Sequence, residues 1–328
     1  MTLLANPGTA SRARGEGAGS KRRDAAARKR RRTWLACYAF VAPSLLLGAL
    51  FTFWPMVASW YYSLLDWTGF VGTQSFVGLD NYQEIVRDQY FWNALKNSFL
   101  LTVVVVPVRM LLSLIVAIVL NGKLPFSNAF RTGFFIPAIT TTAIVGLVMT
   151  LILDPGLGPV NEWMRQLGIT DAAVSFLGNP SLALPTLMVI LIWKPFGITM
   201  VYWLAALQTI PRDVYEAAKI DGASWFQTHT RISAPLLIPF ALVILVLSAA
   251  STLRVFDLVH TMTGGGPFFA TETVEVFIYR NAFAVAGGGS PRIGFASAAG
   301  VVFGAVVLAL AILQWWASQT RSKSRRNV

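Results

Sequence analysis

Very few side chains in this sequence have the types and spacing that covalent chemistry requires. The two histidines, His229 and His260, lack the His-Glu-x-x-His spacing of a zinc hydrolase. Cys37 is the single cysteine, which excludes an internal disulfide or a cysteine zinc site. There is no Gly-x4-Gly-Lys-Ser/Thr phosphate loop, no nucleophile motif and no paired-carboxylate arrangement. The chain is therefore expected to have no catalytic residue, to bind no metal or cofactor, and not to be an enzyme.

Ionisable side chains occur instead inside long apolar segments of the chain. The five are Lys96, Arg109, Lys194, Arg254 and Asp257. A charge at the centre of a bilayer costs several kcal/mol, so each of them should face protein or water. Lys96 lies near the end of its segment and can reach the membrane surface. Arg254 and Asp257 are three residues apart and could pair on one helix.

These charges allow two interpretations. They could line a polar path for a solute, or they could hold helices together and contact a second subunit. Lys194 has aromatic neighbours in its segment, and aromatic faces beside single polar groups suit sugar rings. These neighbours are Trp193, Tyr202 and Trp203. The candidate path residues are Trp193, Lys194, Tyr202, Arg109, Arg254 and Asp257.

Six apolar segments would position these residues. They cover residues 34–57, 96–120, 132–153, 183–209, 236–260 and 293–318. Each is long enough to cross the roughly 30 Å core of a bilayer as a helix. Of all residues 55% are apolar and only 13% are charged, about half the charged share of a soluble protein. The sequence therefore predicts an all-α membrane protein with six transmembrane helices, the fourth of which is interrupted at Lys194-Pro195.

The distribution of charge predicts the orientation of these helices. The two tails and the loops 121–131 and 210–235 carry 19 of the 27 Lys and Arg residues. The alternate loops, 66–95, 154–182 and 261–292, carry four basic residues and nine acidic ones. Because cytoplasmic loops are enriched in Lys and Arg, both termini are expected in the cytoplasm.

The chain divides into three parts on these grounds. Residues 1–33 form a basic tail, rich in Ala, Gly and Arg, that is expected to be disordered. Residues 34–319 form the transmembrane domain, and residues 320–328 form a second basic tail. Basic tails can bind nucleic acid, but these tails flank membrane spans. Membrane lipid is therefore an expected partner and nucleic acid is not. The first apolar segment exceeds the length of a cleaved signal peptide, which favours an uncleaved anchor.

The loop 210–235 carries the signals of a short helix with a defined end. Pro211 suits the first position of a helix, because its missing N–H would have no partner there. Asp213 and Glu216 lie near that helix start, where negative charge is favoured. Gly222 fits a left-handed residue that ends the helix.

A second short helix is predicted directly after this one. Ser224 and Gln227 have the spacing of a capping box, and Pro235 is expected to mark a break before the fifth span. The result is a bent helical pair at the cytoplasmic face, with small residues that could fit closely into a groove on a partner. These small residues are Ala217, Ala218, Gly222 and Ala223. The alternative, an amphipathic helix lying on lipid, is disfavoured because the loop holds three acids beside three bases.

One motif in this loop is long and has fixed spacing. Its positions are Glu216, Ala217, Ala218, Gly222, Ile232 and Pro235. The motif resembles the EAA motif, EAA-x3-G-x9-I-x-L-P, of binding-protein-dependent ATP-binding-cassette (ABC) importer permeases, with Ala234 in place of the leucine. We call residues 210–235 the EAA loop.

Other segments resemble the carbohydrate-type permeases of this family. The segment 76–82, with Asn97 after it, is similar to their first external loop, and the segment 130–137 is similar to the start of their third span. The glycine-rich segment 263–267 resembles an element after the fifth span. That element is typical of the first permease of a pair, the type related to the maltose and glycerol-phosphate importers. The resemblance covers about residues 34–320.

The resemblance implies a type I ABC importer permease fold in a bacterial inner membrane. ATP and Mg would be bound by two cytoplasmic ATPase subunits, while a second homologous permease and an external substrate-binding protein would complete the importer. The EAA loop would dock into a cleft of an ATPase, with Glu216 paired to a cation there and Gly222 permitting the bend. The coupling residues so implied are Glu216, Ala217, Ala218, Gly222, Ile232 and Pro235. The solute would be a sugar, an oligosaccharide or a polyol derivative.

Two other functions compete with this one. An ion-coupled secondary transporter would favour acids inside the membrane, and only Asp257 is available for that role. A membrane receptor or scaffold without transport is disfavoured weakly by the docking loop, because such a loop can also serve in signalling.

Overall fold

The computed structural model describes residues 9–70, 72–122, 125–283 and 289–324. The chain falls into two compact units, Met1–Tyr61 and Tyr62–Val328.

The described residues of the first unit are helical. α1 (Thr9–Gly48), a π-helical segment η1 (Ala49–Phe53) and α2 (Trp54–Tyr62) follow one another directly along the chain. The candidate membrane span Lys29–Tyr62 contains the first predicted apolar segment, 34–57. Because α1 begins at Thr9, helix continues into the basic tail that the sequence predicts to be disordered. Ala and Arg are strong helix formers, which accounts for this continuation.

The second unit supplies the other candidate spans. Within the described residues, three further segments of this unit are long and apolar enough to cross a membrane. They are α4 (Gln89–Asn121), the segment Trp225–Met262, and Ile293–Ile312 within α15 (Ile293–Ser324). Two bent helix pairs pass the same test: α5 (Ser127–Ile139) with α6 (Thr142–Ile152), and α8 (Pro180–Trp193) with α9 (Phe196–Gln208). Together with the first unit this gives four spans, or six if each bent pair is one span, which is the predicted number.

The third predicted span differs from a straight helix. α5 and α6 meet at an angle of 95° because the backbone becomes extended at Thr140 (ψ 138°) and Thr141 (ψ 131°). Both residues are β-branched, which weakens their preference for helix, and Pro137 removes one N–H donor in the turn before them. The segment 132–153 is therefore two helices joined at a sharp bend, and not one continuous helix.

The interruption of the fourth span is confirmed at the predicted place. α8 ends at Trp193, α9 begins at Phe196, and the two helices are bent by 42°. Pro195 has no N–H to give to the carbonyl of Leu191. That carbonyl accepts a hydrogen bond from Arg109 Nη1 of α4 instead, at 3.3 Å. The break is thus stabilised by a side chain from another span.

The fifth predicted span ends earlier than expected. α12 (Ala234–Leu253) stops at Leu253, and a separate short helix, α13 (Asp257–Met262), begins after three non-helical residues. Arg254 and Asp257 therefore do not lie on one continuous helix.

Helix α4 is the centre of the second unit, because it contributes to all three apolar clusters. Leu101 packs with residues of α6, α8 and α13, and Phe91 packs with residues of α3 (Asp80–Arg87), α14 (Val274–Phe283) and α15. Leu120 packs with residues of α9 and α12. In a membrane, close packing and hydrogen bonds hold such helices together, since lipid is as apolar as their side chains.

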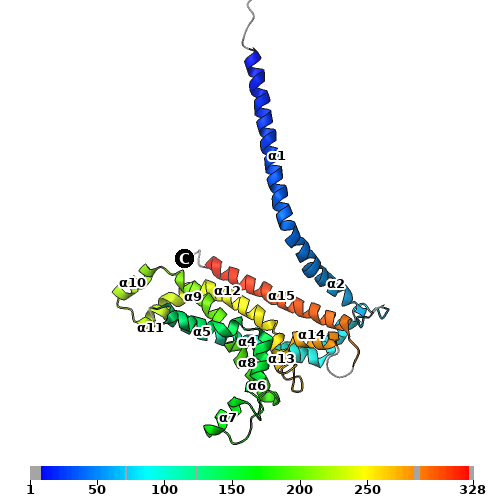
Figure 1. Ribbon diagram of the computed structural model, residues 1–328, viewed down its shortest axis with the longest axis vertical. Coiled ribbons are helices and arrows are strands. Elements are labelled where there is room, and N and C mark those ends of the chain that lie inside the picture. The colour runs from blue at the N-terminus through cyan, green and yellow to red at the C-terminus, as the bar shows by residue number, and fades with distance from the viewer. Residues whose placement is uncertain (1–8, 71, 123–124, 284–288, 325–328) are drawn as a thin grey trace, which may run out of the picture. The chain divides into compact units, whose positions relative to one another are not determined.

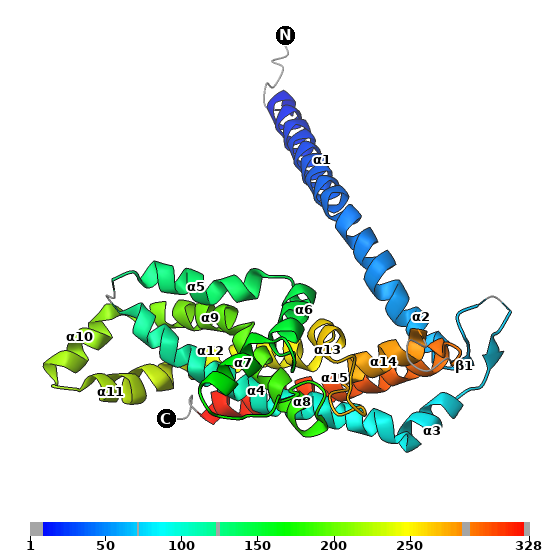
Figure 2. The ribbon, with the colours of Figure 1, turned by 60° about the horizontal axis from the view of Figure 1, so that its bottom comes forward.

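Two groups of short helices mark opposite ends of the second unit. α10 (Arg212–Ile220) and α11 (Trp225–Gln227) lie at one end and α14 lies toward the other, in both Figure 1 and Figure 2, and Figure 2 shows α3 at the same end as α14. A two-residue antiparallel pair, β1 (Leu65–Asp66) with β2 (Ser75–Phe76), also belongs to the end with α3. The EAA loop and α3, which charge assigns to opposite membrane faces, therefore lie at opposite ends of the unit.

Candidate functional site

The first arm of the EAA loop is the helix α10, and its ends are built as the sequence predicts. Asp213 lies in the first turn, although Pro211 is the N-cap and not the first helical residue. Gly222 has a φ of +73°, a left-handed conformation that glycine adopts without strain. The N–H groups of Gly222 and Ala223 donate to the carbonyls of Lys219 and Ala218 at 3.1 and 2.9 Å. This pair of bonds satisfies the last carbonyls of the helix.

The second arm begins with the predicted capping box. The backbone N–H of Gln227 donates to Ser224 Oγ at 3.3 Å, and the backbone N–H of Ser224 donates to Gln227 Oε1 at 2.9 Å. The predicted break at Pro235 is wrong. α11 runs through a π-helical segment, η2 (Thr228–Ser233), directly into α12, and Pro235 lies in the first turn of α12. Proline removes one N–H donor from this continuous run of helix, and the irregular π-helical turn lies directly before it.

The residues of the EAA motif divide between two faces of the loop. Glu216 and Ala217 are exposed, so they are available to a partner. Ala218 is only 4% exposed, and its carbonyl accepts the hydrogen bond from Ala223 at the bend. Ile232 is half-buried and Pro235 is exposed. The motif therefore combines surface residues with residues that shape the loop.

Large apolar side chains flank the bend, and the sequence reasoning missed them. Ile220, Trp225 and Phe226 are 87%, 62% and 69% exposed. We call these three residues the elbow patch. Their position on either side of a predicted turn was the available signal, because large apolar residues at an exposed turn indicate a contact surface. The elbow patch adjoins Gly222, around which a side-chain atom would meet nothing within 4 Å.

Arg109, a candidate path residue, is buried. It is 2% exposed, and its guanidinium donates to the carbonyls of Leu191 and Ser248 at 3.3 and 3.5 Å and to Thr252 Oγ1 at 3.5 Å. These contacts join α4 to α8 and α12. The geometry favours the second interpretation of this charge, which is contact between helices.

The aromatic residues near Lys194 divide into one buried residue and two exposed ones. Trp203 is 3% exposed and donates from Nε1 to the carbonyl of Met110 at 3.0 Å, so it joins α9 to α4. Trp193 and Tyr202 are 43% and 42% exposed. A side chain that is exposed on a span of this chain can contact lipid, the solute or another subunit. Trp193 and Tyr202 are therefore available for contact, and Trp203 is not.

The remaining charges of the candidate path pair differently from the prediction. Lys194, at the break between α8 and α9, interacts electrostatically with Asp257 at the start of α13. Arg254 interacts with Glu275 of α14, whose pKa is raised by burial and held down in part by Arg254. The continuous helix on which Arg254 and Asp257 could pair is not formed, because α12 ends at Leu253.

Asn97 contacts the segment that directly follows the glycine-rich segment 263–267. Asn97 Nδ2 donates to the carbonyls of Ala270 and Glu272 at 3.2 and 3.1 Å. Gly264 and Gly265 have φ values of +59° and +89°, which explains the need for glycine at both positions. The amide of Asn97 thus fastens the loop after α13 to α4.

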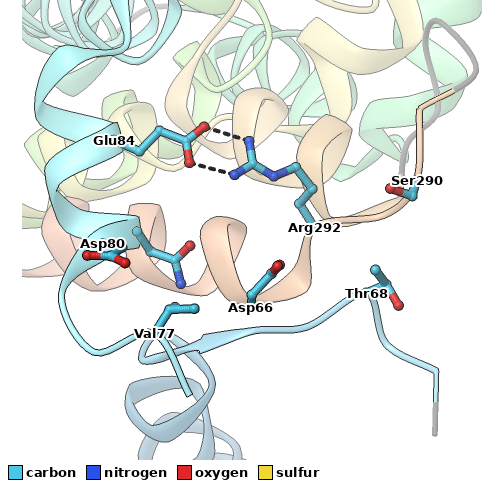
Figure 3. A pocket seen from close by; sticks show the side chains of 8 residues that line it. Asp66, Thr68, Val77, Asp80, Glu84, Ser290 and Arg292 are labelled. Atoms are coloured by element: carbon cyan, nitrogen blue, oxygen red, sulfur yellow. Dashed lines mark hydrogen bonds and ion pairs between the residues drawn. The ribbon is translucent and has the colours of Figure 1, made fainter. Parts of the chain in front are cut away.

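A polar cavity of about 360 Å³ lies at the end of the unit that holds α3 (Figure 3). Arg292 donates to both carboxylate oxygens of Glu84, at 2.7 and 2.6 Å. This hydrogen bond lowers the pKa of Glu84. Asp66 and Asp80 also line the cavity. The ion pair links α3 to Arg292, the residue before α15. The side chains that line the cavity therefore also hold these two segments together.

Comparison with known proteins gives consistent matches. Residues 98–322 match the family described as binding-protein-dependent transport system inner membrane component. The chain is 31% identical over 279 residues to the probable ABC transporter permease protein YurN of Bacillus subtilis, which covers 84% of this chain and 94% of that protein. It is 32% identical over 287 residues to the lactose transport system permease protein LacF of Rhizobium radiobacter, which covers 87% of this chain and 94% of that protein.

A solved structure matches the fold over nearly the same length. It is a bacterial alginate ABC transporter in complex with an alginate pentasaccharide-bound periplasmic protein. One of its chains aligns with a TM-score of 0.75 and 25% sequence identity, over 87% of this chain and 93% of that chain.

Proposed function

This chain belongs to the family of binding-protein-dependent transport system inner membrane components, and from that premise we propose how it works as the permease subunit of an ABC importer for a carbohydrate. Its all-α fold is that of a type I importer permease. Relatives named for lactose transport and a structural neighbour that handles alginate support a sugar, an oligosaccharide or a polyol derivative as the solute. Hydrolysis of ATP, with its Mg, belongs to partner subunits.

One observation carries the proposed mechanism: the EAA loop presents a contact surface at one end of the second unit. Glu216 and Ala217 are exposed beside the elbow patch, and this combination of a charge with large apolar side chains suits a cleft on another protein. We assign this surface to the cytoplasmic ATPase. Ala218, Gly222, Ile232 and Pro235 shape the loop that presents it.

The importer needs further partners for the solute to cross. A complex with an ATPase and a binding protein follows from the family, and the structural neighbour was solved with its periplasmic protein. We assign two ATPase subunits and a second homologous permease to the assembly. The membrane is the bacterial inner membrane, and the positive charge of both tails orients them toward the cytoplasm.

The solute path is assigned to the candidates that remain accessible. Trp193 and Tyr202 are exposed, and the interacting groups Lys194 and Asp257 lie at helix ends, where single polar groups can turn toward a solute. Arg254 is exposed as well. Arg109 is excluded from this set because its guanidinium is used inside the helix bundle.

The test of this function is recovery of the ATPase with the permease. Glu216→Lys in the assembled importer is expected to abolish co-purification of the ATPase and ATP-dependent uptake of the sugar, because the change reverses the charge of the docking surface. Glu162→Lys is the matched control, since Glu162 is an exposed acid in the loop between the third and fourth spans. ATPase recovery that survives Glu216→Lys, with uptake intact, would refute the assignment.

A further inference from the structure

A buried hydroxyl joins the two arms of the EAA loop. Ser233, the last residue of η2, is 0% exposed. Its Oγ lies 3.2 Å from the hydroxyl of Tyr215 on α10 and 3.2 Å from Nδ1 of His229 on η2. We call Tyr215, His229 and Ser233 the clasp.

The clasp can satisfy all of its polar groups. A serine hydroxyl donates one hydrogen bond and can accept others, so Ser233 can accept from Tyr215 while it donates to His229 Nδ1. Ser233 is buried while Tyr215 and His229 are half-buried, so the central hydroxyl depends most on having its partners. Removal of the central hydroxyl would leave both outer members without that partner.

The clasp lies between the docking surface and the membrane span. The indole ring of Trp225, in the elbow patch, packs edge-on against the ring of His229, with centroids 4.6 Å apart. Ser233 is followed directly by α12, which crosses the membrane. A displacement of Trp225 would therefore act through His229 and Ser233 on the cytoplasmic end of α12.

The clasp contact lies in η2, where the π-helical geometry makes the second arm of the loop less rigid than a regular α-helix. Short π-helical turns hold an extra residue, occur rarely and are frequent at functional sites. A π turn can relax to α-helix, and that change would alter the rotation of everything before it relative to α12. The contact of Tyr215 with Ser233 opposes this relaxation by tying η2 to α10.

We propose that the clasp makes the two arms of the EAA loop move as one body, and that Ser233 is a positioning residue for the coupling of ATP hydrolysis to transport. This inference rests on the proposed role of the EAA loop in docking the ATPase. The clasp acts on what happens after docking: with the clasp intact, movement of the elbow patch reaches α12, and without it the π turn absorbs that movement.

The experiment measures ATP hydrolysed per solute carried by the assembled importer in vesicles. Ser233→Ala removes the central oxygen and adds no volume, and Tyr215→Phe removes one partner. Each is expected to keep the ATPase bound and to raise the ATP consumed per solute by about tenfold, an estimate that corresponds to 1.4 kcal/mol. The double variant is expected to be no worse than either single variant, because the residues act as a unit. Thr230→Ala is the matched control, since its hydroxyl bonds only locally to the carbonyl of Phe226 in the described structure.

Distances between spin labels at Lys219→Cys and Thr230→Cys, in a Cys37→Ser background, provide a second measurement. The distribution is expected to broaden in Ser233→Ala and to stay narrow in the parent. An unchanged ATP-to-solute ratio in Ser233→Ala would overturn the inference while the proposed function stands. Loss of the bound ATPase in Ser233→Ala would also overturn it, because the clasp would then shape the docking surface. Uptake of the solute by the parent importer without ATP would refute the proposed function itself.

Discussion

The buried carboxylate of Glu272 is held by one specific partner, Arg280. Glu272 is 0% exposed, and its carboxylate accepts from Arg280 Nε at 2.7 Å. Burial raises the pKa of Glu272, and the hydrogen bond from Arg280 opposes that rise. The guanidinium of Arg280 also lies 4.8 Å from the ring centre of Phe269. This group of side chains fixes the segment between α13 and α14.

We predict that Glu272→Ala destabilises the protein by about 3 kcal/mol, since removal of one member leaves the other charge largely buried without its partner. The measurement is the thermal or denaturant unfolding of the purified permease in detergent. Glu162→Ala is the control, because the ion pair of Glu162 with Arg165 is about half exposed on both sides. An exposed pair contributes about 0.5 kcal/mol or less. Equal losses for the two variants would contradict the prediction.

At the scale of elements, close contact between helices depends on small residues. α5 packs against α9, and a Cβ atom placed on Gly197 of α9 would come within 2.7 Å of the Cα of Phe135 and would overlap the carbonyl oxygen of Phe134. Gly133 of α5 has nothing within 4 Å of the same position. The close packing of α5 and α9 thus requires glycine at position 197 but not at position 133.

We expect Gly197→Ala to destabilise the permease by about 1–3 kcal/mol, because the two helices must separate to admit the methyl group. Gly133→Ala is expected to be neutral or to stabilise its helix by about 0.5–1 kcal/mol. Unfolding of both variants under the same conditions checks this difference. A neutral Gly197→Ala would show that α5 and α9 do not pack as closely as described.

At the scale of the whole molecule, the orientation in the membrane determines which loops face the cytoplasm. If the bent pair of α8 and α9 crosses the membrane as one span, the EAA loop and the loop that contains α7 (Pro159–Gln166) face opposite sides. The excess of Lys and Arg assigns the EAA loop to the cytoplasm. The single native cysteine, Cys37, makes this assignment simple to test.

In a Cys37→Ser background, we predict that a membrane-impermeant maleimide labels Asp171→Cys in intact spheroplasts. Lys219→Cys, which is in the EAA loop, is expected to react only after the membrane is made permeable. Both positions are exposed, so access to the reagent depends on the side of the membrane. The reverse pattern of labelling would invert the predicted topology.

The sequence by itself determined the features that depend on local chemistry. Hydropathy located six apolar segments because a bilayer requires about twenty apolar residues in succession. Gly222 and the Ser224–Gln227 capping box were predictable because helix ends have to satisfy their backbone groups within a few residues. The break at Lys194-Pro195 followed from the missing N–H of proline.

Only the tertiary structure decided which side chains meet. Arg109 became a contact between helices because Pro195 leaves the carbonyl of Leu191 free on a helix that packs against α4. The helix ends at Leu253, inside the predicted fifth span and before Asp257, and no local pattern marks that break. Contacts between distant segments depend on packing and register in three dimensions, and a single sequence records the residues but not their neighbours.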